Sequence, residues 1–282
     1  MSFHLIVILA MLILCANVLA GDPTTRAMGP IVDGIKGVQR WTIDTPYLGK
    51  PSMIEVLLPD KIEAGKTYRT LYVLPVEGGI GGQYGDGLAE VRKVDAHNKH
   101  QLICVTMSFD SVPWYGAHAT DLKKRHAEFI LKDVIPFIES KYPASAKSED
   151  RLLLGFSKSG WGAVSLLLRN PDTFGKACAW DAPLMMDEAQ LKWGSKDHFG
   201  TPDAAMGYVP TRLIQERSQT FSKGPPRLVI LGHDNYSKDT AAFHELLDSL
   251  KVPHRFDNSL KVKHRWDSGW VERAVEMLMV AQ

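Results

Sequence analysis

Short apolar runs alternate with longer amphipathic segments through most of the chain. The apolar runs predict six strands, at residues 53–59, 69–76, 101–109, 151–157, 176–182 and 227–233, and residues 254–262 resemble a seventh. The later runs are continuously apolar, as in strands that helices cover on both faces. Helical patterns fall between them, at residues 117–141, 160–169 and 240–250. This alternation predicts an α/β fold with a mostly parallel central sheet, right-handed crossovers and helices on both faces.

One segment interrupts the alternation. Residues 184–226 are polar, punctuated by Gly and Pro, and contain no convincing strand pattern. Long segments of this kind often form lids over one end of a sheet. We therefore expect a lid-like excursion here, with a helical crossover between long loops as the alternative.

The chain begins with a different pattern. Residues 5–20 are almost wholly apolar, and small side chains precede the polar stretch that starts at Gly21. The run is shorter than the roughly twenty residues that span a bilayer, and no basic cluster follows it. These features predict a signal peptide at residues 1–20, cleaved near Ala20, and a secreted or periplasmic protein with no stable membrane insertion after cleavage. A retained anchor is the alternative.

The remaining residues, 21–282, are long enough for one large domain. With 33 basic and 32 acidic residues, no overall field favours nucleic acid, so none is expected as a partner. Cys104 and Cys178 each lie in an apolar run and are expected to pack as small hydrophobic residues. No Cys or His spacing indicates zinc, so no metal and no cofactor are predicted.

The sequence LLLGFSKSGWGA, residues 152–163, resembles a nucleophile elbow. A strand precedes Ser157 and a helix follows it, and Gly155 lies two residues before the serine. The usual second glycine is replaced by Ser159. Small residues are needed because the turn is sharp enough for neighbouring side chains to collide. The spacing makes Ser157 a candidate nucleophile, with an ordinary serine in a strand-to-helix turn as the alternative.

A catalytic serine needs a histidine as base and a carboxylate that orients this histidine. Asp234 follows an apolar strand directly, and His264 follows the next strand-like stretch. The order Ser, Asp, His is typical of α/β-hydrolases. Asp181, at the end of the preceding strand, is the alternative acid, but Asp234 is preferred.

The chain resembles the putative esterase family that includes esterase D-type enzymes, feruloyl esterases and mycolyltransferases. The matching pieces are LLGFSKSGWGA, DTFGKACAWDAP, RLVILGHDNY and KHRWDSGW, within a region from about Leu71 onward. The resemblance implies the α/β-hydrolase fold, with Ser157 as nucleophile, His264 as general base and Asp234 as the orienting acid. The mycolyltransferase branch also lacks the second elbow glycine.

The resemblance also locates an oxyanion hole, with one departure. Family members carry His-Gly or Asp-Gly after the strand that corresponds to residues 71–74, whereas this chain has Pro75 and Val76. The backbone amides of Glu77 and Lys158 would then be the two donors, and backbone donors need no particular side chain. Trp114 and Tyr115 follow a strand and could bind substrate, with simple packing of the two rings as the alternative. Lys158 and His126 are expected to be solvated.

These features predict a secreted, metal-independent serine hydrolase that cleaves carboxylic esters through an acyl-enzyme. The partner expected is a small-molecule or carbohydrate ester, and the oligomeric state is open. Acyl transfer and peptide hydrolysis are alternatives on the same fold. A catalytically inactive binding or scaffold protein is an alternative from another class, suggested by residues 75–77.

Overall fold

A computed structural model describes residues 26–32, 37–187, 192 and 194–280. The signal peptide predicted for residues 1–20 lies outside these residues. Among the helices of the described residues, none is both long and apolar enough to cross a membrane.

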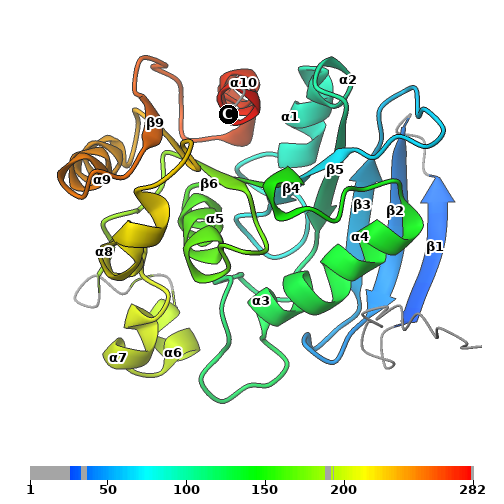
Figure 1. The fold of residues 1–282 in the computed structure, drawn as a ribbon. Helices are drawn as coiled ribbons and strands as arrows, with labels where there is room; N and C mark the ends of the chain where they lie inside the picture. Colours follow the sequence, from blue (N-terminus) through cyan, green and yellow to red (C-terminus); the bar gives the residue numbers. More distant parts are fainter. Residues whose placement is uncertain (1–25, 33–36, 188–191, 193, 281–282) are drawn as a thin grey trace, which may run out of the picture.

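Nine strands form one twisted sheet, in the order β1-β2-β3-β5-β4-β6-β7-β8-β9. Strands β1, β2, β3 and β5 pair antiparallel, whereas β5, β4, β6, β7, β8 and β9 run parallel. Figure 1 shows the antiparallel strands at the blue edge of the sheet. The strands are β1 Arg26–Val32, β2 Val38–Asp44, β3 Ser52–Leu57, β4 Arg69–Leu74, β5 Leu102–Met107, β6 Arg151–Phe156, β7 Lys176–Trp180, β8 Leu228–Leu231 and β9 His254–Asp257.

Helices cover both faces of the sheet. The helices are α1 Gly87–Lys93, α2 Ala96–Lys99, α3 His126–Phe129, α4 Ile135–Lys141, α5 Lys158–Arg169, α6 Ser195–Phe199, α7 Pro202–Met206, α8 Pro210–Phe221, α9 Ser237–Ser249 and α10 Val271–Met279. A π-helical turn, Ile130–Val134, joins α3 to α4, and short 3-10 turns lie at Ser148–Asp150 and Trp266–Ser268.

The two cores follow the alternation of side chains along the strands. In β4, Tyr72 and Leu74 pack in the core shared with α4, α5, α8 and α9. Leu71 and Val73 face the other core, which α1 and α10 close. Both faces are therefore buried, which accounts for the continuous apolar runs of the central strands. Cys104 and Cys178 are free and buried in the second core, as expected.

Most predicted elements are present, with two differences in helix boundaries. The helix expected over 117–141 begins only at His126, because residues 117–125 form a loop with bridges to neighbouring segments. Helices expected at 160–169 and 240–250 begin two or three residues earlier than predicted. Strands β1 and β2 were not foreseen.

The described part of the excursion at residues 184–226 contains three helices and no strand. Helix α8 packs against α5 and so behaves as a crossover helix. Phe199, Ala205 and Val209 form a small apolar cluster with Trp114 and Trp161. Helix α8 thus matches the crossover alternative, whereas the other described helices of the segment pack on Trp114 and Trp161 beside α5.

Candidate active site

The turn between β6 and α5 holds Ser157 in a backbone conformation that side chains rarely adopt. Its φ is 53° and its ψ is −126°. Ser157 N–H donates to the carbonyl of Trp180 on β7, which ties the turn to the sheet. Gly155 is required next to it, because a β-carbon there would lie 2.2 Å from the Ser159 carbonyl oxygen. The sequence thus forms a sharp elbow that exposes the Ser157 hydroxyl at the start of a helix.

Ser159 replaces the usual glycine for a visible reason. Its hydroxyl donates to the Phe156 carbonyl at 2.9 Å and accepts the Phe156 N–H at 3.0 Å. The side chain is fully buried and satisfies the last residue of β6. Gly160, one position further, is the residue that needs to be small, because a β-carbon there would lie 2.9 Å from Ala182 Cβ.

His264 connects Ser157 to a carboxylate. Its Nε2 lies 2.9 Å from Ser157 Oγ, and its Nδ1 lies 2.6 Å from Asp181 Oδ2. Nδ1 therefore carries a proton that it donates to Asp181, and Nε2 is free to accept the serine proton. The rings of Phe156, Tyr84 and Tyr236 surround the imidazole, with centroids 4.5, 5.8 and 5.5 Å from its own.

Asp181 follows β7 and is fully buried. Besides the His264 imidazole, its two oxygens accept the backbone N–H groups of Asn235 and Tyr236, each at 2.9 Å. Gly232 makes this approach possible, because a β-carbon there would lie 2.7 Å from the Asp181 backbone. Three segments, the end of β7, the loop after β8 and the segment with His264, thus meet at this carboxylate.

The preferred pairing of His264 with Asp234 is corrected by this geometry. Asp234 does follow β8 and does reach His264, but its Oδ2 accepts the backbone N–H of His264 at 2.6 Å. The imidazole Nδ1 bonds to Asp181 instead. The loop after β8 turns Asp234 outward and directs the N–H groups of Asn235 and Tyr236 at Asp181 instead. The alternative acid, Asp181, occupies the position that the sequence assigned to Asp234.

A cavity of about 220 Å³ opens beside Ser157. Its walls combine two aliphatic side chains, two tyrosines and polar groups: Val76, Glu77, Tyr84, Val112, Ser157, Lys158, Asn235, Tyr236 and His264. A larger hollow of about 360 Å³ between α1 and β3 shares none of these residues. The serine, its histidine and a bounded space for a substrate therefore occur together only in the smaller of these two cavities.

The two expected amide donors lie in the walls of this cavity. Lys158 is the first residue of α5, so its N–H has no partner within the helix. The Glu77 carboxylate packs against Gly82, where a β-carbon would lie 2.0 Å from Oε2. The Tyr115 hydroxyl donates to the Pro75 carbonyl and holds the residues that precede Glu77.

The Lys158 side chain is buried, contrary to the expectation that it would be solvated. It is 7% exposed, and its Nζ donates to the Pro113 carbonyl at 3.0 Å, above the Trp114 ring. Burial lowers the pKa of Lys158 to about 7, although the charge of Glu77 opposes the shift. His126 is buried as well, and its Nδ1 accepts the Trp114 N–H.

Trp114 and Tyr115 do not line the cavity at Ser157. Trp114 is 2% exposed and packs on Trp161 and Phe199. Tyr115 is fully buried, and its ring fills the space beside Gly162, where a β-carbon would lie 2.1 Å away. Both residues support the walls from behind, and Tyr84 and Tyr236 provide the aromatic surface that the cavity presents.

Sequence reasoning missed Tyr84, Asn235 and Tyr236. Tyr84 lies in a loop of glycines with no periodic pattern. Asn235 and Tyr236 do follow Asp234 directly, and their position after a strand was a usable signal.

Comparison with known proteins identifies the family of the chain. The family model of the putative esterases matches residues 45–219, which is more than half of the chain. The chain belongs to the putative esterase family. It is thus a carboxylic ester hydrolase with the α/β-hydrolase fold. No curated protein matches the chain.

Several solved structures share this esterase fold. The chain is similar to an S-formylglutathione hydrolase from Staphylococcus aureus, with a TM-score of 0.67 and 19% identity over 84% of this chain and 95% of that one. It is also similar to the fluorophosphonate-binding serine hydrolase F of Staphylococcus aureus, with a TM-score of 0.68 and 20% identity over 86% of this chain and 96% of that one. For a ferulic acid esterase the TM-score is 0.65 and the identity is 18%, over 90% of this chain and 97% of that one.

Proposed function

We propose that this esterase hydrolyses its substrate through a Ser157, His264 and Asp181 triad. The hydrogen-bonded series from Ser157 Oγ through His264 to the buried Asp181 carboxylate supports the proposal. His264 Nε2 takes the proton as Ser157 Oγ attacks the ester carbonyl, and returns it to the leaving alcohol. Water then attacks the acyl-enzyme by the same route and releases the acid.

The backbone amides of Lys158 and Glu77 are proposed as the oxyanion hole. The α5 N-terminus adds a favourable field for the developing negative charge. Only the backbone N–H of Glu77 is needed for this role. Its side chain packs against Gly82, which supports the proposal. The Pro75-Val76 departure from the family pattern therefore leaves a possible donor in place.

The substrate is proposed to be a carbohydrate-linked acyl ester. Tyr84, Tyr236, Val76 and Val112 present a partly apolar wall of modest size, which suits a short or aromatic acyl group. The likeness to a ferulic acid esterase supports the same class. Acyl transfer to a sugar acceptor would use the same acyl-enzyme.

A fluorophosphonate probe tests the nucleophile, because it labels an activated serine and leaves an idle one untouched. The wild-type protein should be labelled and should hydrolyse p-nitrophenyl acetate, whereas Ser157→Ala should do neither. The nearby Ser165→Ala variant is a matched control on the same helix and should be labelled normally. Failure of the folded wild-type protein to react would instead favour an inactive scaffold.

Labelling with the same fluorophosphonate probe also tests whether the protein is exported. We propose that residues 1–20 direct secretion and that the mature chain begins near Gly21. Full-length protein expressed in a secreting bacterial host should yield a labelled species outside the cytoplasm whose N-terminal sequence starts at or near Gly21. An intact Met1 in the membrane fraction would show that the segment is retained.

A further inference from the structure

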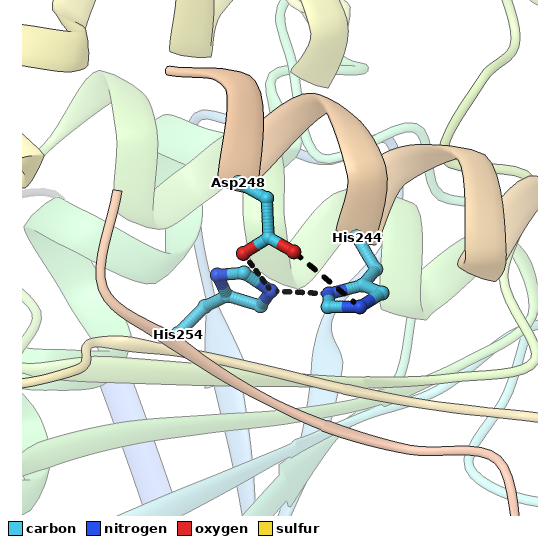
Figure 2. A group of neighbouring side chains, drawn as sticks. All are labelled: His244, Asp248 and His254. Atoms are coloured by element: carbon cyan, nitrogen blue, oxygen red, sulfur yellow. Dashed lines mark hydrogen bonds and ion pairs between the residues drawn. The ribbon is translucent and has the colours of Figure 1, made fainter. Parts of the chain in front are cut away.

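Three side chains far from the nucleophile converge between α9 and β9. His244 and Asp248 are four residues apart and therefore share one face of α9, and His254 begins β9. Figure 2 shows the Asp248 carboxylate above the two imidazoles, with dashed lines joining each pair of the three side chains. His244 Nδ1 lies 2.7 Å from His254 Nε2, and the Asp248 oxygens lie 3.6 and 3.9 Å from His244 Nε2 and His254 Nε2.

When both imidazoles of this cluster are neutral, their nitrogens and the Asp248 carboxylate present more lone pairs than there are protons to pair with them. His254 Nδ1 lies 2.8 Å from the Val252 carbonyl, which can only accept, so Nδ1 carries the proton of the neutral ring and Nε2 presents a lone pair. Neutral His244 has one proton. If this proton is on Nδ1, the Nε2 of His244 presents a lone pair to the Asp248 carboxylate. If it is on Nε2, the lone pairs of His244 Nδ1 and His254 Nε2 face each other at 2.7 Å. A cation at the centre removes this conflict.

We propose that His244, Asp248 and His254 form a binding site for a divalent transition metal of the Zn²⁺ class. Two imidazoles and one carboxylate are ligands that zinc uses, whereas Ca²⁺ and Mg²⁺ prefer oxygen ligands. Donors bound to one zinc at about 2.1 Å in a tetrahedron lie about 3.4 Å apart. With one donor atom from each side chain, the three donors lie within 4.8 Å of one another, so a bound zinc would draw them closer together.

The surroundings resemble those of known metal ligands. The Val252 carbonyl fixes the His254 tautomer with Nε2 toward the site, which is the usual arrangement around a coordinating histidine. The His244 ring stacks on Phe256, with centroids 4.2 Å apart, and this contact fixes its plane. The exposed side of Asp248 leaves the fourth position open to water.

A metal at this site would join α9 to β9. Helix α9 begins directly after Asn235 and Tyr236, whose N–H groups bind Asp181, and β9 leads to His264. The two elements lie side by side in Figure 1. Metal binding would therefore stabilise the part of the fold that carries the base, and the proposal does not depend on the triad.

Zinc titration of the tag-free full chain, stripped with EDTA, tests the site at pH 7.5. We expect one Zn²⁺ per chain by elemental analysis, and a rise in Tm of roughly 5 °C at about a hundredfold excess over the Kd. Co²⁺ should give the visible absorption of a tetrahedral complex. Affinity should fall steeply at about pH 5, because protonated imidazoles cannot coordinate.

Variants locate the bound ion. His254→Gln and Asp248→Asn should each weaken binding at least about 100-fold. Asp248 is largely exposed, so Asp248→Asn should fold normally. His233→Gln removes an exposed histidine outside the cluster and should bind as the wild-type protein does. Less than one ion per chain, or equal affinity in Asp248→Asn, would overturn the proposal, and Ser157→Ala should bind Zn²⁺ unchanged.

Discussion

Two aspartates approach His264, and their surroundings separate their roles. Asp181 is fully buried and accepts three hydrogen bonds, one from the imidazole and two from backbone N–H groups. Asp234 is exposed and accepts the backbone N–H of His264. In the proposed triad, a buried carboxylate on Nδ1 stabilises the imidazolium that forms when His264 takes the serine proton, whereas a carboxylate on the backbone only positions the loop.

Asparagine substitutions therefore have unequal effects. Asp181→Asn should lower kcat by about 10⁴-fold, the loss known for the same change in a serine protease triad, because the imidazole loses its tautomer and its counter-charge. Asp234→Asn should cost about tenfold, as expected for one exposed hydrogen bond of about 1.4 kcal/mol. Ester hydrolysis by both variants, after circular dichroism has shown that they fold, measures the difference. A crippled Asp234→Asn and an active Asp181→Asn would reverse the assignment.

The sequence is sufficient to predict that Ser157 and His264 act together, but it does not decide which of the two aspartates is the acid. Asp181 and Asp234 each follow a strand, β7 and β8, and these strands are neighbours in the sheet. The choice depends on Asn235 and Tyr236, whose N–H groups reach Asp181 only because the loop passes close to it at Gly232. Such a backbone approach leaves no periodic pattern. The burial of Lys158 was missed for a related reason, since its partner is the Pro113 carbonyl.

At the scale of elements, the junction of β6 and α5 determines where Ser157, the proposed nucleophile, lies. The chain turns directly from strand to helix at Ser157, and the first turn of α5 passes so close to β6 that Gly155 faces the Ser159 carbonyl. Main-chain atoms surround this position and cannot rotate away. The size of residue 155 is therefore a condition for the elbow itself.

Gly155→Ala should destabilise the protein by at least about 3 kcal/mol and abolish labelling by a fluorophosphonate, because overpacking against backbone moves the strand, the helix or both. Gly207→Ala is the matched control. Gly207 ends α7 with a helical φ of −65°, and the nearest atom to its added β-carbon would lie 3.5 Å away. Urea unfolding of both variants gives the comparison. Equal stabilities would show that the elbow has more room than the structure indicates.

Periodicity predicted the elements of the parallel half of the sheet better than those of its edge. β6 and β7 are buried on both faces, so their apolar runs are long and distinct. β2 is only partly buried and mixes polar with apolar residues, so a search for apolar runs does not detect it. The helix expected from residue 117 fails over its first nine residues, 117–125, where isolated bridges at Ala117, Lys124 and Arg125 replace the helical pattern.

For the whole molecule, the buried Lys158 links stability to pH. The unfolded chain holds this ammonium in water, with a pKa near 10.5, whereas burial lowers the pKa in the folded protein to about 7. Below pH 7 both states are protonated and the folded state bears the full cost of a buried charge. Between pH 7 and 10.5 the unfolded state binds more protons, so stability rises with pH.

Comparison with Lys158→Met isolates this effect. The free energy of unfolding of the wild-type protein minus that of the variant should rise by about 1.4 kcal/mol per pH unit between pH 7.5 and 9.5, because one proton separates the two states. Loss of the hydrogen bond to Pro113 adds an offset that does not change with pH. Lys238→Met, which removes an exposed lysine, is the matched control. Urea unfolding at three pH values measures the slope, and a flat difference for Lys158→Met would mean that the folded protein keeps this ammonium charged.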